Sequence, residues 1–175
     1  DVSLPDGFGA FEKRLIFIQK KPEHHQTNQV LSIKNIFEIR HLLAKQQAYH
    51  YQLDEEYFSS LQDFQIDAYL DEIQKKLNDG SAAAFGIREN GTWLGFAVIE
   101  KEDDAAYLLE LMVEEEARGK GYGKMLVASS ENWAAEQLFT RLWTSVSAQN
   151  ESAFAFYQKL GFKPFKERYA RYRRL

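Results

Sequence analysis

The chain has 175 residues, of which 45% are hydrophobic and 14% aromatic, so it can bury the core of one domain but is short for two. Its formal net charge of −4 argues against broad binding to a nucleic-acid backbone, which requires an excess of lysine and arginine on one face. The absence of cysteine excludes a disulfide, a thiolate nucleophile and a cysteine-ligated metal.

Two features bear on location. The longest apolar run, near residues 15–18, is far shorter than the roughly 18 to 20 apolar residues that a membrane span requires. The chain opens with Asp1 and lacks the basic region and long apolar region of a signal peptide. We therefore expect a soluble, cytoplasmic protein without a membrane partner. We also expect a single domain over residues 1–175, in which residues 1–10 are mobile because they are rich in glycine and polar groups.

The first half of the chain predicts one strand and two helices. Residues 14–19 are typical of a strand, and residues 30–49 carry apolar residues at helical spacing. A second helical pattern runs over residues 66–77 and ends near Gly80, where glycine suits a helix C-terminus. Between the two helices, residues 53–63 are acidic and aromatic.

The period then changes to that of strands. Residues 82–88 and 92–100 are apolar and flank the turn pair Asn90 and Gly91, which predicts a β-hairpin. Residues 106–113 follow an acidic turn and add a third strand, so the three strands form an antiparallel meander.

The last third of the chain predicts a β-α-β unit, a further helix and a final strand. Residues 106–113, a helix over 121–137 and a strand over 141–147 make the unit. Asn150 is placed to cap a helix that Gly161 closes, and residues 165–172 form the last strand.

Three glycines, Gly119, Gly121 and Gly123, lie between the strand that ends at Val113 and the following helix. Backbone N–H groups at a helix N-terminus lack intrahelical partners and bind phosphate oxygens, and glycine lets them approach closely. A Walker loop fails because Met125 stands where serine or threonine is required. A dinucleotide fingerprint is poor because Lys124 stands where glycine or alanine is needed.

The turn from Arg118 to Gly123 resembles the central motif of the GCN5-related N-acetyltransferases. A second block agrees with that family: Asn150, followed by Phe156, Tyr157, Leu160, Gly161 and Phe162 at matching spacing. The resemblance covers residues 82–172 well, whereas residues 1–80 match only in the order of their elements.

The resemblance implies a mixed α/β fold. Its central sheet is twisted and mostly antiparallel, with a parallel, splayed strand pair and helices on both faces. Acetyl-coenzyme A would lie between the splayed strands, with its pantetheine arm on the backbone of Met112 and Val113 and its pyrophosphate on the amides of residues 119–124. The implied cofactor-binding residues are Leu111, Met112, Val113, Arg118, Gly119, Lys120, Gly121, Tyr122, Gly123, Lys124, Asn150 and Tyr157.

Acetyl transfer to an amine requires one group that takes a proton and one that gives a proton. Tyr157, which matches the family's motif tyrosine, is the candidate acid for the departing thiolate; a core or purely positioning role is the alternative. Glu110 is the candidate base if burial raises its pKa, and a solvent-facing or salt-bridged strand residue is its alternative. Asp54, Glu55 and Glu56 form another acidic source.

Other charged and aromatic groups have simpler explanations. The acidic residues 54–56, beside Tyr49 and Tyr57, could contact a cationic acceptor, but a solvated loop is the simpler explanation. The four histidines lack metal-ligand spacing, so we expect no metal. Five lysines and arginines between residues 166 and 174 belong to the exposed face of a last strand and do not predict nucleic-acid binding.

Two functions therefore stay open. The first is an acetyl-coenzyme A-dependent N-acetyltransferase that acts on a primary amine of a small molecule or peptide by direct attack. The second is a catalytically weak domain that binds acetyl-coenzyme A as a regulatory or structural ligand. A homodimer is open in either case, and the acceptor is not defined by the sequence.

Overall fold

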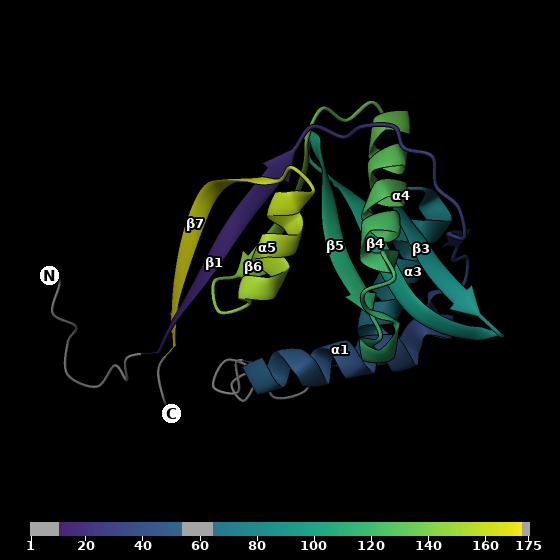
Figure 1. Ribbon diagram of the computed structural model, residues 1–175, viewed down its shortest axis with the longest axis horizontal. Coiled ribbons are helices and arrows are strands. Elements are labelled where there is room, and N and C mark those ends of the chain that lie inside the picture. The colour runs from purple at the N-terminus through teal and green to yellow at the C-terminus, as the bar shows by residue number, and fades with distance from the viewer. Residues whose placement is uncertain (1–10, 54–64, 173–175) are drawn as a thin grey trace, which may run out of the picture.

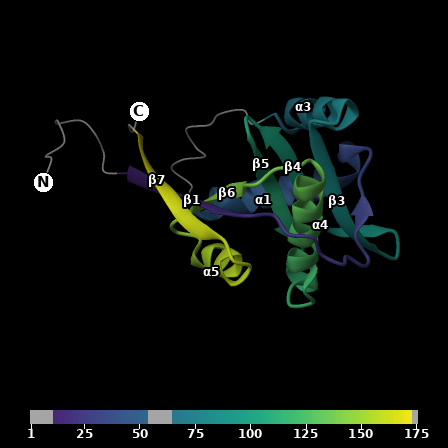
Figure 2. The same ribbon diagram turned by 90° about the horizontal axis from the view of Figure 1, so that it is seen from above.

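The computed structural model describes residues 11–53 and 65–172 of the chain. These residues form one seven-stranded sheet with helices against both faces, as Figure 1 and Figure 2 show. The stretch expected to be mobile, residues 1–10, and the acidic residues Asp54, Glu55 and Glu56 lie outside the described residues.

The sheet confirms the expected mixed α/β architecture. Neighbouring strands are antiparallel except β5 and β6, which are parallel. In sheet order the strands are β2 (Leu31–Ser32), β3 (Ala82–Glu89), β4 (Thr92–Glu102), β5 (Ala105–Val113), β6 (Leu142–Ser147), β1 (Phe11–Lys20) and β7 (Lys163–Tyr172).

Within residues 11–53 and 65–172, four α-helices cover the two faces of the sheet, and each face has its own apolar core. Helices α1 (Arg40–Leu53) and α3 (Ile66–Asp79) pack on one face, where Leu43, Leu70 and Phe96 are fully buried. Helices α4 (Tyr122–Glu136) and α5 (Glu151–Lys159) lie on the opposite face, over a core that includes Leu126 and Phe162. Burying a side chain of this size contributes roughly 1.5–3 kcal/mol, so both faces stabilise the sheet.

The parallel pair is joined at one end only. β5 and β6 pair at Ala106 with Leu142 and at Tyr107 with Trp143, although β5 continues to Val113 and β6 to Ser147. Beyond Tyr107 the two strands separate, and Figure 1 shows β6 and α5 diverging from β5 and α4. The predicted splay is therefore present, and it leaves the edge of β5 open.

A bulge in β5 decides which face its last residues occupy. Val98 of β4 pairs with Glu110 and Ile99 pairs with Leu108, so Leu109 is an extra residue. Leu108 faces the α4 side, and strict alternation would place Glu110 beside it. The bulge instead turns Glu110 toward α3, where it contacts Tyr69.

The predicted helix over residues 30–49 is wrong in its first part. Residues 31–32 form β2, a short 3-10 turn η1 (Ile36–Ile39) follows, and α1 begins only at Arg40. The N–H of Ile33 donates to the carbonyl oxygen of Ala84 at 2.8 Å, which extends the pairing with β3. Asn35 then caps η1 by accepting from the N–H of Phe37. The apolar residues at helical spacing in this part of the chain therefore belong to the end of a strand and to a 3-10 turn.

The other predicted elements are confirmed, with small changes at their ends. Gly80 closes α3 in the left-handed conformation, with φ of 77°. Asn90 and Gly91 have φ of 50° and 80°, as the hairpin between β3 and β4 requires. Across residues 11–53 and 65–172, none of the helices is both long enough and apolar enough to span a membrane.

Candidate acetyl-coenzyme A site

The glycine-rich turn joins the open end of β5 to α4. β5 ends at Val113, a short 3-10 turn η2 (Glu115–Ala117) follows, and Gly119 and Gly121 adopt φ of 80° and 82°. A Cβ on either glycine would meet no atom within 4 Å, so the backbone conformation, and not space, requires glycine at both positions.

Helix α4 begins with unpartnered amides. The N–H of Met125 donates to the carbonyl oxygen of Gly121 at 3.1 Å, which is the first intrahelical bond. The N–H groups of residues 122–124 precede it and have no carbonyl one turn earlier in the helix to bind. They carry the positive end of the helix dipole, so this turn suits an anion.

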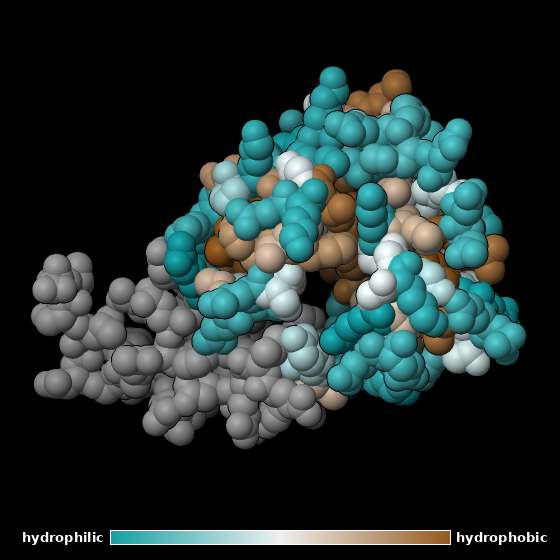
Figure 3. Space-filling model, viewed as in Figure 1, coloured by the Kyte–Doolittle hydropathy of each residue, from teal (hydrophilic) through white to brown (hydrophobic). Residues whose placement is uncertain are grey.

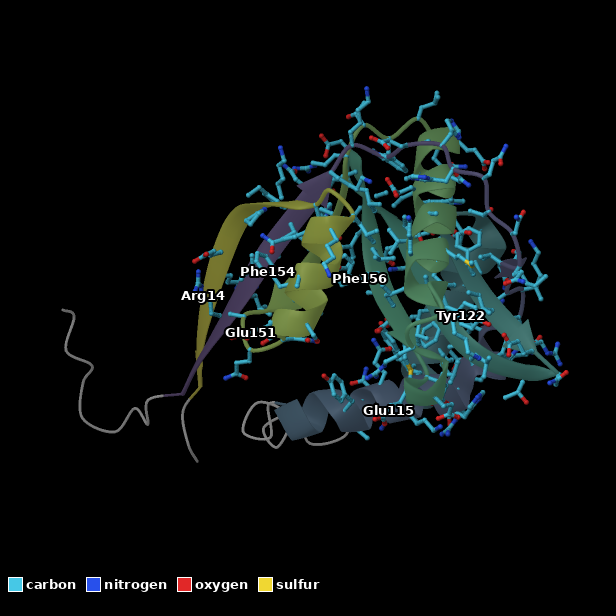
Figure 4. The ribbon with its side chains drawn as sticks, in the orientation of Figure 1. Arg14, Glu115, Tyr122, Glu151, Phe154 and Phe156 are labelled. Carbon is cyan, nitrogen blue, oxygen red and sulfur yellow. The ribbon has the colours of Figure 1, made fainter. Side chains whose placement is uncertain are left out.

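The third glycine has a different role. A Cβ on Gly123 would lie 3.2 Å from Cζ of Phe156, so its absence lets α5 approach the first turn of α4. Figure 4 labels Phe156 on α5 and Tyr122 at the start of α4, the two helices that flank the opening.

A pocket of about 480 Å³ occupies this opening. Figure 3 shows the hollow between the two halves of the molecule, with hydrophobic residues at its back. It is bounded by α1, the end of β5, the glycine-rich turn and the start of α5. The lining residues are Gln46, Tyr49, Leu111, Met112, Val113, Ala117, Arg118, Gly119, Gly121, Tyr122, Gly123, Lys124, Asn150, Ser152, Ala153 and Phe156.

Most of the residues predicted to hold the cofactor therefore lie together around one pocket. Lys120 and Tyr157 are not among the described residues that line it. The ammonium of Lys120 instead lies 4.0 Å from Oε2 of Glu89, and the hydroxyl of Tyr122 donates to the same carboxyl group. These contacts tie the turn to the hairpin between β3 and β4.

The backbone of β5 alternates along the open edge. The carbonyl oxygen of Leu111 accepts from Nε2 of Gln46 at 3.2 Å, and that of Val113 accepts from Nε of Arg118 at 3.3 Å. These two residues direct their backbone groups away from β4, because N–H and C=O of one strand residue point to the same side. The N–H groups of Leu111 and Val113 consequently face the splay.

Asn150 fixes the start of α5. Its Oδ1 accepts from the N–H of Ala153 and from the hydroxyl of Ser152, both at 3.2 Å. This is a side-chain cap of the kind that the sequence predicts at this position. The cap sets the direction in which α5 leaves the splayed strand β6.

Gln46 and Phe156 are lining residues that sequence reasoning did not assign to the site. Gln46 is buried and follows Leu42 and Leu43 by one helical turn, so helical period places it on the inward face of α1. Helical period likewise places Phe156 on the inward face of α5. Neither pattern shows that these inward faces lie beside the end of β5.

Glu110 lies on the α1 and α3 face in a partly buried, mostly neutral setting. Oη of Tyr69 donates to its Oε1 at 2.6 Å. Desolvation by burial raises the pKa of Glu110 to about 7, and hydrogen bonds from Tyr69 and Gln46 partly oppose that rise. A carboxyl group with such a pKa exchanges protons near neutral pH.

Tyr157 is buried in the core on the α4 and α5 face, where its ring centroid lies 5.2 Å from that of Phe156 and 5.3 Å from that of Phe162. Burial, and then the neighbouring Tyr107 and Glu110, raise the pKa of Tyr157 above the usual tyrosine value. Its hydroxyl therefore stays protonated at neutral pH.

Residues 11–53 and 65–172 contain no group of three or more histidine, cysteine, aspartate or glutamate side chains that could hold a metal ion. His25 is engaged elsewhere, because its Nε2 lies 2.9 Å from Oε2 of Glu131 on α4.

The open β5 edge, the glycine-rich helix start and the capped α5 define an acetyltransferase-like site. Residues 46–162 match the model of the acetyltransferase (GNAT) family, which is more than half of the chain. The chain belongs to this family.

Known relatives agree with this assignment. The chain is 32% identical over 108 residues to the peptidyl-lysine N-acetyltransferase YjaB of Salmonella typhimurium, covering 58% of this chain and 66% of that protein. It is 30% identical over 78 residues to the ribosomal protein bS18-alanine N-acetyltransferase of Escherichia coli K12, covering 45% and 53%. The chain thus spans less than two thirds of these curated relatives.

A solved structure shares the fold. The PaiA N-acetyltransferase of Thermoplasma acidophilum, in complex with coenzyme A, superposes with a TM-score of 0.64 at 23% identity. The superposition covers 84% of this chain and 98% of that one, so the two proteins share most of the fold.

Proposed function

We propose that this chain is an acetyl-coenzyme A-dependent N-acetyltransferase, and that its acceptor is a primary amine of a small molecule or peptide. The observation that carries the proposal is the pocket at the start of α4. There the glycine-rich turn, the open edge of β5 and the cap of α5 meet. Family membership supports the reaction class, and the complex of a structural relative with coenzyme A supports the donor.

The residues of the pocket fit the donor. The free N–H groups of residues 122–124, at the positive end of the α4 dipole, would hold the pyrophosphate. Arg118 and Lys124 add positive charge beside them. The N–H groups of Leu111 and Val113 would bind the pantetheine arm and polarise the thioester carbonyl.

Glu110 is the candidate base that would take a proton from the acceptor amine. With a pKa of about 7, Glu110 would accept the amine proton directly or through water, which frees the nitrogen lone pair for attack. The attack forms the C–N bond of the amide and breaks the C–S bond of the thioester. The relatives are named for lysine and alanine acceptors, whose amines are primary, and this supports the proposed acceptor class.

Tyr157 would stabilise the departing sulfur. Because burial keeps its hydroxyl protonated, it would hydrogen-bond to the thiolate as the C–S bond breaks and supply the proton that makes coenzyme A. The second proton, which the nitrogen loses as the amide forms, would restore the hydroxyl through solvent. The chain has no cysteine that could carry the acetyl group as a covalent intermediate, which is consistent with direct transfer.

The experiment measures release of free thiol from acetyl-coenzyme A across a panel of primary amines, for wild type and Tyr157→Phe. We expect acceptor-dependent release from the wild type and about 10²-fold slower release from the variant. Acetyl-coenzyme A affinity should change little, since the ring and its packing are kept. Binding of acetyl-coenzyme A without acceptor-dependent release would favour a regulatory coenzyme A-binding domain instead.

A further inference from the structure

Tyr69 makes a short hydrogen bond to the proposed base from an element outside the recognised motifs. It lies on α3, and its Oη is 2.6 Å from Oε1 of Glu110 on β5. Forty-one positions separate the two residues, so tertiary packing and not local sequence brings them together. The bulge at Leu109 is what turns Glu110 toward α3.

The position of Tyr69 is fixed by the packing of α3. Leu70 and Ile73 on the same helix are buried in the α1–α3 core. Arg40 on α1 pairs with Asp67 at 2.7 Å, and Lys76 pairs with Glu100 of β4 at 2.6 Å. The helix is therefore held on both sides of Tyr69, which limits the freedom of its hydroxyl.

The described groups that act on Glu110 come from several elements. Tyr69 of α3 and Gln46 of α1 donate hydrogen bonds to its carboxyl group. Tyr107 on the same strand and Tyr157 of α5 lie near enough to feel its charge. Glu100 of β4 acts on Tyr69 and Tyr107, and its own carboxylate is paired with Lys76. Among the described residues, the carboxylate of Glu110 is therefore held by neutral hydrogen-bond donors and not by cations.

We propose that Tyr69 is the positioning residue for the base, holding one oxygen of Glu110 so that the remaining lone pairs of the carboxylate face the acceptor amine. This inference rests on the proposed function, in which Glu110 takes the amine proton. A tyrosine hydroxyl can donate only one hydrogen bond, and here the donor is directed at Oε1.

The same bond controls ionisation. Burial, and then the charge of Glu110, raise the pKa of Tyr69, so its hydroxyl remains a donor throughout the working pH range. A hydrogen bond to the charged form of a carboxyl group lowers its pKa. Tyr69 therefore offsets part of the burial effect and keeps the pKa of Glu110 near neutrality.

The test is the pH dependence of kcat/KM for a primary amine with wild type and Tyr69→Phe. Loss of the donor should raise the acid-limb pKa by about one unit, which lowers activity about fivefold at pH 7. Activity should recover on the alkaline side of the limb, and the KM for acetyl-coenzyme A should not change. Asp71→Asn, on the exposed side of α3, is the matched control, and it should leave the limb in place.

Glu110→Gln and the double variant separate this inference from the proposed function. If Tyr69 acts through Glu110, adding Tyr69→Phe to Glu110→Gln causes no further loss. An acid limb that is unchanged in Tyr69→Phe, while Glu110→Gln abolishes it, would overturn the role of Tyr69 alone. An acid limb that persists in Glu110→Gln would remove Glu110 as the base, and the role of Tyr69 with it. Thermal unfolding of each variant confirms that it is folded.

Discussion

At the scale of single residues, backbone conformation sets the chemistry of the glycine-rich turn. Gly119 and Gly121 both have positive φ and open space where a Cβ would lie. A side chain there would strain the turn by roughly 1–2 kcal/mol without any clash. The conformation of these glycines directs the N–H groups of the turn. Gly80, at the end of α3, also has a positive φ and open space where a Cβ would lie.

Gly121→Leu tests this role of the turn. We expect a loss of stability of about 1–2 kcal/mol from strain at positive φ and at least about tenfold weaker binding of acetyl-coenzyme A, or about 1.4 kcal/mol. Gly80→Leu is the matched control, because Gly80 has φ of 77° and an equally open Cβ position. It should lose similar stability and keep the affinity. Calorimetric titration and thermal unfolding measure both quantities; equal affinity in the two variants would contradict the role.

At the scale of elements, the sequence predicts best where one residue fixes one end. Gly80 and Asn150 mark the end of α3 and the start of α5, and the structure has both. The strand β2 and the bulge at Leu109 were missed because pairing register depends on a partner far away in the chain. Most of the pocket lining could be predicted from the sequence motifs, whereas the lining residue Gln46 and the Tyr69 contact to Glu110 depend on how α1 and α3 pack on the sheet.

Asn150→Ala should destabilise the protein by about 1 kcal/mol, because the first turn of α5 loses its side-chain acceptor. Asn150→Asp keeps an oxygen at the same position and should retain most of the stability. Urea unfolding followed by tryptophan fluorescence compares the two variants with wild type. An equal loss in both would show that the cap bonds to Ala153 and Ser152 do not stabilise α5.

At the scale of the whole molecule, a buried ion pair joins the two halves of the sheet. Nζ of Lys20, at the end of β1, lies 2.7 Å from Oε1 of Glu131 on α4, and their side chains are only 10% and 4% exposed. Lys20 also donates to the carbonyl oxygen of Leu160, after α5. Strand β1, helix α4 and helix α5 are thus connected on the side of the sheet away from α1.

Lys20→Met should reduce the free energy of unfolding by up to about 3–5 kcal/mol, since the buried Glu131 carboxylate would lose the ammonium at its Oε1 and keep only His25 at its Oε2. Lys20→Met combined with Glu131→Leu should recover much of that loss, because neither charge is then buried. Chemical denaturation of the three proteins measures the cycle. A double variant that is no more stable than Lys20→Met would show that the pair acts through shape and not through charge.

The proposed function requires that the turn after β5 binds the phosphates of acetyl-coenzyme A. The direct measurement is a titration followed by the backbone amide resonances of ¹⁵N-labelled protein, with Gly119, Gly121 and Gly123 as reporters. We predict saturable shifts at these glycines and at residues 111–113, with Gly80 and Gly91 unchanged. Saturable binding that leaves the resonances of the turn in place would contradict the claim.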